Sequence, residues 1–309
     1  MIGEQIVVGL LTNCSERASS AKNLLFSHNI VQRIAEVEIA EHLDLLLSVF
    51  VHEPIELRRL LRRHEAVITG ETLMWFIMDK VGRFQTDWCY DELDICCPLS
   101  QFDQFVDAFI GLVNGEVVDE WEEVEEELQV DRVASRATIG IVRKIRVEGF
   151  RHHFNLLCSS DNNALNPVFA QWNTALFNIL THDHLIIAYP TLTLSHKAQL
   201  SSKQFIQVDA ETAERYRKNG FLIRQSIADF SDELCYRGGC GGHPACPRTP
   251  RYFGDELSLS FPLSPKSSSE HQVTRDDVWL WAGSGCSVEC CRTKDKDIAR
   301  VREILCAGE

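Results

Sequence analysis

The segment from Ala66 to Pro98 constrains the fold of this 309-residue chain more than any other stretch. It begins with a short apolar run that ends at Thr69-Gly70, and the residues from Glu71 to Met78 have the composition of a helix. A polar connection then leads to Glu92-Leu93-Asp94-Ile95. Because alternate residues of a strand face the same way, this pattern predicts a strand, a helix and a second strand that carries both carboxylates on one face.

The two carboxylates of the second strand would repel each other unless a cation or a proton neutralised them. Hard oxygen ligands of this kind suit Mg²⁺ held together with substrate phosphates. Glu92 and Asp94 are therefore candidate Mg²⁺ ligands, and Leu93 and Ile95 are expected to face the core.

This order of strand, glycine, helix and acid pair resembles the nucleotidyltransferase fold of the DNA polymerase β type, over about residues 59–159. The chain is more specifically similar to uncharacterised fungal proteins that carry this core. The matching positions are Thr69-Gly70-Glu71, Trp88 and Glu92-Leu93-Asp94-Ile95. The resemblance implies an α/β (α+β) fold, with a mixed sheet and flanking helices. It also implies transfer of a nucleotide from a nucleoside triphosphate to an unknown acceptor, with two Mg²⁺ ions held by acids on adjacent strands.

The family pattern occurs here in a degenerate form. The Gly-Ser that holds a phosphate in the family is Gly70-Glu71, and the first Asp of its acid pair is Glu92. The third acid is expected on a later strand, where the candidate is Asn155, which can coordinate a metal but cannot act as a base. Glu92, Asp94 and Asn155 are the candidate catalytic residues, and Gly70 and Glu71 the candidate cofactor-binding residues. The alternatives are an inactive fold that serves as a nucleotide-binding or protein-interaction module, and a purely structural protein.

Charge and hydropathy restrict the partners and the compartment. The net charge of −14 disfavours a nucleic-acid backbone as the main partner, because affinity for that backbone comes from clustered Lys and Arg. The apolar run Ile6–Leu11 is short and follows Glu4, which is not the pattern of a secretory signal. The run Leu45–Val51 is too short to span a bilayer. We therefore expect an intracellular protein, cytoplasmic or nuclear, that does not act at a membrane.

Three regions are expected along the chain: a helical N-terminal segment at 1–58, a nucleotidyltransferase-like core at 59–230, and a cysteine-rich extension at 231–309 packed on the core. In the first region, apolar spacing between Val31 and Phe50 predicts one or two helices. Pro54 is suited to open the next helix, from Ile55 to Arg63, since its missing N–H costs nothing at that position.

Further elements of the core follow from periodicity and from turn residues. We expect a helix capped by Ser100 that reaches about Val113, an amphipathic helix over the acid run Glu116–Glu127, and a hairpin of two strands joined at Glu148-Gly149. A helix opened by Pro167 is expected to reach Leu180. The remaining predictions are a strand from His184 that ends at Pro190 and a helix over Ala210–Lys218 that closes at Asn219-Gly220.

The C-terminal region concentrates thiols. Cys235, Cys240, His243 and Cys246 lie within twelve residues, separated mostly by glycines and other small residues. These ligand types suit a tetrahedral structural Zn²⁺, and a second group at Cys286, Cys290 and Cys291 could contribute to the same site. The spacing is looser than that of Cys-x₂-Cys pairs, so buried free cysteines and a disulfide stay open as alternatives.

Overall fold

The computed structural model of the chain describes residues 37–80, 91–122, 139–147, 150–169, 171–200, 210–224, 251–255 and 257–263. These residues form a mixed α/β fold and divide into two compact units. The first unit contains the described residues up to Val168, Asn178–Ile186 and the segment that begins at Ser260. The second contains Phe169–Phe177 and the described residues of Ile187–Leu259.

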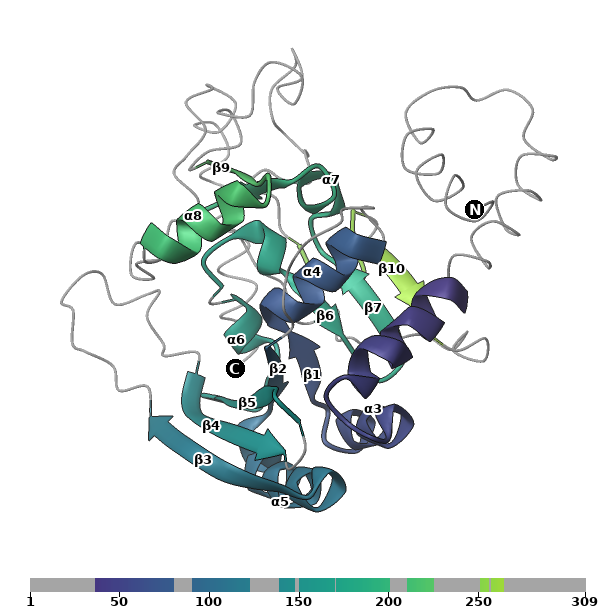
Figure 1. Cartoon of the computed structure of the whole chain (residues 1–309), viewed down its shortest axis with the longest axis vertical. Helices are drawn as coiled ribbons and strands as arrows, with labels where there is room; N and C mark the ends of the chain where they lie inside the picture. Colours follow the sequence, from purple (N-terminus) through teal and green to yellow (C-terminus); the bar gives the residue numbers. More distant parts are fainter. Residues whose placement is uncertain are drawn as a thin grey trace, which may run out of the picture. The chain divides into compact units, whose positions relative to one another are not determined.

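The first unit is built on an eight-stranded mixed sheet (Figure 1). The strands are β1 Val67–Thr69, β2 Glu92–Cys97, β3 Gly115–Glu122, β4 Ile139–Val147, β5 His153–Ser159, β6 Asn178–Leu180, β7 His184–Ile187 and β10 Leu259–Pro262. Their order in space is β10-β7-β6-β1-β2-β5-β4-β3. Strands β2 and β5 are parallel, whereas β1 pairs antiparallel with β2 and β6, and β4 pairs antiparallel with β3 and β5.

Helices flank this sheet. They are a helix over residues 37–48, α3 Pro54–Arg63, α4 Gly70–Lys80, the 3₁₀ turn η1 Leu99–Gln101, α5 Phe102–Val113 and the short α6 Asn166–Phe169. The helices expected before β1 are confirmed at residues 37–48 and in α3, where Pro54 occupies the first turn. The strand and helix expected between Ala66 and Met78 are confirmed as β1 and α4.

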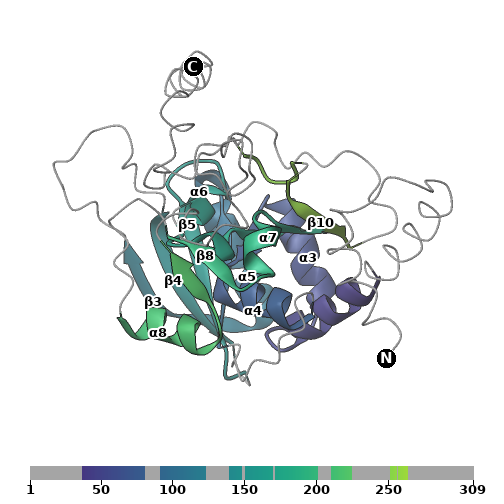
Figure 2. The same ribbon diagram turned by 90° about the horizontal axis from the view of Figure 1, so that it is seen from above.

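One face of the central strands is the main core of the first unit. Leu93 and Ile95 on β2 are fully buried, as expected from the alternation. Phe154, paired with Leu93 across β2 and β5, lies against Phe50 and against Phe109 of α5, with ring centroids 5.7 and 4.7 Å apart. Helices α3 and α5 also pack on each other (Figure 2). On the opposite face, the first half of β2 and of β5 carries the polar side chains Glu92, Asp94 and Asn155.

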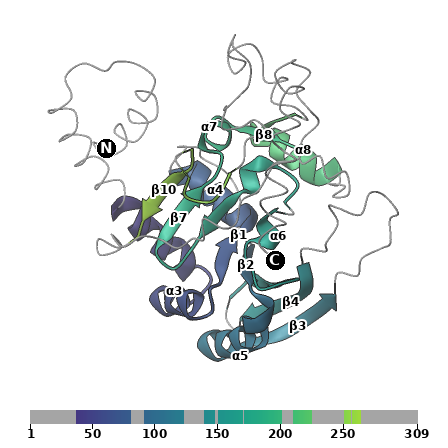
Figure 3. The same ribbon diagram turned by 180° about the vertical axis from the view of Figure 1, so that it is seen from behind.

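The acid run after α5 forms a strand and not the expected helix. The helix α5 does end at Asn114, which is left-handed (φ 49°), but the chain then enters β3, at the edge of the sheet next to β4 (Figure 3). Opposite charges across the two strands stabilise the pairing: Arg146 binds Glu116, and Arg143 binds Glu120. Tertiary pairing therefore overrides the helical spacing of the apolar residues in this run.

The helix predicted from Pro167 to Leu180 is also wrong. The chain forms only α6, the 3₁₀ turn η2 Thr174–Leu176 and strand β6 there. Asn173 ends the helical spacing because its side-chain oxygen accepts a hydrogen bond from the Ala175 amide at 2.7 Å, a local bond that favours a turn. The apolar residues that recur at helical spacing in this stretch are nevertheless buried, namely Val168, Trp172, Leu176 and Leu180.

Other boundaries follow the sequence more closely. The expected hairpin is confirmed as β4 and β5, and the expected strand at His184 is β7. The expected cap at Ser100 is wrong, because η1 precedes α5 and the Ser100 amide binds the Asn162 side chain at 3.0 Å.

The second unit is a smaller assembly of short elements. Its parts are η2, α7 Pro190–Thr193, α8 Ala210–Lys218, and the parallel pair of β8 Lys197–Gln199 with β9 Leu222–Arg224. Helix α8 has the predicted bounds, and the chain turns after it at Gly220, with φ of 82°. Tyr216 of α8 is buried and meets Trp172 edge to face, with ring centroids 4.9 Å apart.

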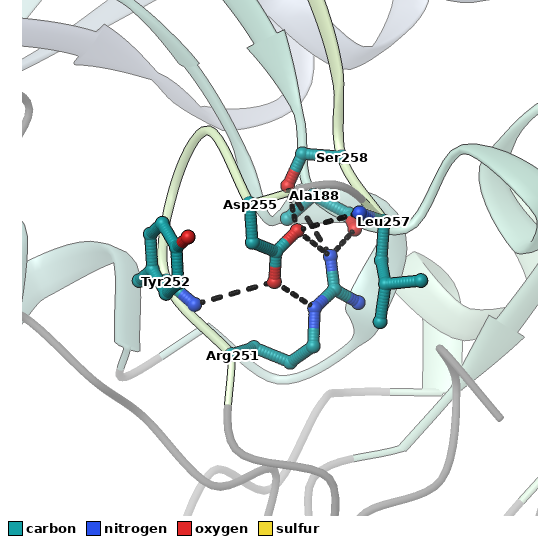
Figure 4. A network of polar contacts seen from close by, with 6 residues as sticks. All are labelled: Ala188, Arg251, Tyr252, Asp255, Leu257 and Ser258. Carbon is teal, nitrogen blue, oxygen red and sulfur yellow. Dashed lines mark hydrogen bonds and ion pairs between the residues drawn. The ribbon is translucent and has the colours of Figure 1, made fainter. Parts of the chain in front are cut away.

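A buried ion pair holds the segment 251–258 in this unit (Figure 4). Arg251 is fully buried and binds both carboxylate oxygens of Asp255. Its Nη2 also donates to the Ala188 carbonyl at 2.6 Å and to the Ser258 hydroxyl at 3.2 Å, and its guanidinium lies over the Tyr189 ring at 4.9 Å. Burial raises the pKa of Asp255, but its bonds to Arg251 lower it by more, so the carboxylate stays charged.

In the part of the chain that the structure describes, no helix is both long enough and apolar enough to cross a membrane.

Candidate functional site

The glycine at the end of β1 lies directly against the second carboxylate of the acid pair. Gly70 has a φ of 88°, a conformation that glycine adopts without the penalty of a Cβ atom. A Cβ added there would lie 2.1 Å from Oδ2 of Asp94. Gly70 was predicted as a cofactor-binding residue; in this structure its missing side chain leaves space for the Asp94 carboxylate.

Glu92 and Asp94 point from β2 to the same side of the sheet, as the alternation predicts. Glu92 is exposed and Asp94 half-buried. The main chain of β2 is fixed here from two sides, because Thr69 of β1 pairs with Asp94 and the Thr72 hydroxyl of α4 donates to the Glu92 carbonyl. The carboxylates are thus presented from regular secondary structure, which holds them more rigidly than a loop would.

Asn155 connects the two carboxylates. It lies on β5 beside Asp94, and its Nδ2 donates to Oδ1 of Asp94 at 2.8 Å and to Oε2 of Glu92 at 3.0 Å. The structure therefore brings together the three predicted catalytic residues. The amide presents its hydrogen-bond donors to both acids, so it does not offer them a metal-binding oxygen.

Lys144 is a fourth member of this cluster. It lies on β4, paired with Asn155, and its ammonium forms an ion pair with Oε1 of Glu92. Sequence reasoning missed this residue, although the register of the β4–β5 hairpin could have placed it opposite Asn155. Its side chain is 27% exposed, so the pair is only partly screened by water.

The two carboxyl groups have pKa values shifted in opposite directions. Burial raises the pKa of Asp94, the bond from Asn155 lowers it, and the charges of Glu92 and Glu71 raise it further, giving a value of about 6. Burial also raises the pKa of Glu92, but the bonds from Lys144 and Asn155 and the Lys144 charge lower it by more, so the net pKa is below the usual value. Near neutral pH both groups are charged, and Asp94 is the easier to protonate.

Glu71, the other predicted cofactor-binding residue, follows Gly70 in the first turn of α4. Its negative charge contributes to the raised pKa of Asp94, so it lies close enough to act on the acid pair. An anionic side chain at this helix start counters the favourable field that would otherwise attract a phosphate. The local electrostatics therefore disfavour the phosphate contact that the resemblance implies.

Mg²⁺ fits the ligand types of this cluster but not its arrangement. Carboxylate and amide oxygens are suitable donors, yet Asn155 turns its nitrogen toward both acids and Lys144 already neutralises Glu92. Across the described ranges, no group of three or more His, Cys, Asp and Glu side chains is placed to hold a metal ion. The predicted Mg²⁺ ligation by Glu92 and Asp94 thus stays a prediction, and we derive no reaction step through a metal.

The other predicted site residues lie outside the described residues. These are Trp88 of the family pattern and the candidate Zn²⁺ ligands Cys235, Cys240, His243 and Cys246, with the second group at Cys286, Cys290 and Cys291. The cysteines that the structure describes, Cys96, Cys97 and Cys158, are buried and free. Burial raises their pKa values, which makes these thiols poor nucleophiles.

Comparison with known proteins adds no relative: no family model, no curated protein and no solved structure matches this chain.

Proposed function

We propose that this chain is a nucleotidyltransferase-like protein that has lost phosphoryl transfer and acts as a nucleotide-binding or protein-interaction module. The order of elements supports the first half of this proposal. A glycine ends β1 and opens α4, the acid pair follows on the neighbouring strand β2, and the candidate third position is on β5, parallel to β2. This is the order of parts that the sequence resemblance implies.

One observation carries the loss of catalysis: Asn155 donates hydrogen bonds to both Glu92 and Asp94. Two-metal phosphoryl transfer needs negative oxygen ligands that converge on a pair of cations. A neutral amide at the third position supplies no charge and no base, and its donors compete with a cation for the same carboxylate oxygens. Glu71 beside Gly70 opposes the approach of a phosphate as well.

Mg²⁺-dependent nucleotide transfer is the competing function, and the exposed side chain of Glu92 is the feature that favours it. An ion from solvent could reach this carboxylate if Lys144 moved away. The two functions differ in one measurable property. Only the competing function predicts turnover, and that turnover should need the acid pair.

The test is release of pyrophosphate from ATP and GTP, with Mg²⁺ and with desalted cell extract as the source of acceptors. Wild type is compared with the double variant Glu92→Gln/Asp94→Asn, and calorimetric titration of the same nucleotides is run beside it. We expect no release above the extract alone, and any nucleotide binding should be independent of Mg²⁺ and unchanged in the variant. Mg²⁺-dependent release that the double variant abolishes would overturn the proposal.

A further inference from the structure

A row of polar side chains crosses three neighbouring strands at the acid pair. Asp94 on β2 pairs with Asn155 on β5, and Asn155 pairs with Lys144 on β4. Residues paired in this way project to the same face of a sheet. The row therefore places one cationic and one neutral hydrogen-bond donor beside the acid pair through backbone register alone.

Each of the four carboxylate oxygens of the acid pair has a protein neighbour. Oε1 of Glu92 meets the Lys144 ammonium, Oε2 of Glu92 and Oδ1 of Asp94 accept from Asn155, and Oδ2 of Asp94 lies against the backbone at Gly70. Three of these oxygens thus have a hydrogen-bond or ion-pair partner, as partly buried carboxylates require when they are held close together.

We propose that Lys144 and Asn155 take the place of a divalent cation in this cluster, so that the native site has little affinity for Mg²⁺ or Mn²⁺ and those two residues conceal a latent metal site. This inference rests on the proposed function and explains how the acid pair persists without a metal. Lys144 supplies the positive charge, and Asn155 supplies the bridge between the two carboxylates.

The physical cost of metal binding follows from the same contacts. A divalent ion at Glu92 would have to displace the Lys144 ammonium, which would lose its partner in a partly buried place. Asn155 would have to turn its amide to offer Oδ1, giving up both hydrogen bonds to the acids. Lys144→Met removes the ammonium, and Asn155→Asp replaces the amide by a carboxylate. Together these changes remove both costs and add an anionic ligand for the metal.

The experiment is titration of Mn²⁺ and Mg²⁺ without nucleotide, followed by calorimetry and, for Mn²⁺, by electron paramagnetic resonance. It compares wild type, Glu92→Gln/Asp94→Asn, the double variant Lys144→Met/Asn155→Asp, and a fourfold variant that carries all four substitutions. We expect the double variant to bind Mn²⁺ at least tenfold more tightly than wild type and the fourfold variant to lose this gain. Circular dichroism verifies that each variant is folded. If the double variant is unfolded, the single variant Lys144→Met replaces it, and we expect this variant also to bind Mn²⁺ more tightly than wild type.

Wild-type binding of Mn²⁺ as tight as that of the double variant, and lost in Glu92→Gln/Asp94→Asn, would overturn the inference. So would an unchanged affinity in folded Lys144→Met/Asn155→Asp. Either result is separable from failure of the proposed function, because metal binding is measured without nucleotide and turnover is measured as pyrophosphate release. Tight metal binding by the wild type without pyrophosphate release would overturn this inference and leave the proposed function standing.

Discussion

At the residue scale, Gly70 and Asp94 depend on each other. The carboxylate occupies the space where a side chain at position 70 would begin, and the backbone there is left-handed. The segment from β1 to α4 can therefore keep this shape only with glycine at its corner. The carboxylate cannot simply move aside, because Asn155 holds its other oxygen.

Gly70→Ala should destabilise the first unit by about 1–3 kcal/mol, from the strained φ and from the contact with Asp94. Urea unfolding measures the change. Gly111→Ala is the matched control, since Gly111 is an exposed position of α5 with no atom near its added Cβ, and alanine should stabilise the helix by up to ~1 kcal/mol there. A double-mutant cycle with Asp94→Ala should show coupling, and additive effects would contradict the direct contact.

The raised pKa of Asp94 makes a prediction about pH. The folded protein binds a proton at Asp94 more readily than the unfolded chain, so this group lowers the unfolding free energy as pH rises from about 4 to about 6, and the loss then levels off. Asp94→Asn keeps an acceptor for Asn155 and removes the charge that Glu92 and Glu71 repel. It should raise the melting temperature at pH 7.5, with a smaller gain at pH 4.5.

Glu92→Gln is the control for this pH series, with the opposite sign. The pKa of Glu92 is lowered in the folded protein, so its charged form stabilises the fold above the usual carboxyl pKa, and that stability is lost as pH falls. Glu92→Gln should therefore lower the melting temperature at pH 7.5. Equal effects of the two variants would show that Lys144 and Asn155 do not distinguish the two carboxyl groups.

At the scale of elements, the sequence predicted the parts whose local signals agree with their packing. The alternation of residues along a strand predicted which face of the sheet each side chain from Glu92 to Ile95 would take. Gly70 and Pro54 marked the starts of α4 and α3. The family resemblance implied acids on adjacent strands, and Glu92, Asp94 and Asn155 do meet from β2 and β5. Lys144 was not anticipated, because its place depends on a hairpin register that composition alone does not reveal.

The two incorrect helices have a common physical cause. In β3 and in the stretch from Pro167 to Leu180, apolar residues recur at spacings that also suit a helix, but each stretch forms a strand that pairs with another strand of the sheet. In the first stretch β3 pairs along its length with β4, and the charge pairs of Glu116 and Glu120 with β4 add to this pairing. In the second, Leu180 pairs with Ile68 of β1, a contact more than a hundred residues away in sequence. Local periodicity contains no information about such partners.

Arg143 should determine how firmly β3 is attached. It binds Glu120 of β3 and Asp103 of α5, the latter at 2.9 Å, and lies over the Phe102 ring at 5.1 Å. Arg143→Ala should speed amide hydrogen exchange in β3, by an amount that corresponds to about 1–2 kcal/mol of local stability. Arg146→Ala removes a more exposed pair with Glu116 and should cost less than ~1 kcal/mol. Equal amide exchange of β3 in the two variants would contradict the proposal that Arg143 attaches β3 to β4 and α5.

At the scale of the whole molecule, both units contain aromatic contacts, and the second also buries an ion pair. The first has an aromatic core between its sheet and helices, and it contains every described residue of the acid-pair site. The second is built from short elements and buries a charged group, because Arg251 is among its largest fully buried side chains. A buried charge is tolerated only where partners satisfy it, which Asp255, Ala188 and Ser258 do.

Arg251→Met should therefore destabilise the second unit by about 3–5 kcal/mol, because it leaves Asp255 charged, buried and without its cation. Amide exchange in α7, β8 and the segment 251–258 measures the loss within that unit. Arg224→Met, at an exposed position of β9, is the matched control and should change exchange little. Arg251→Met/Asp255→Leu removes both charges and should recover part of the stability. If Arg251→Met changed amide exchange in the second unit no more than Arg224→Met does, the stability of this unit would not depend on the ion pair.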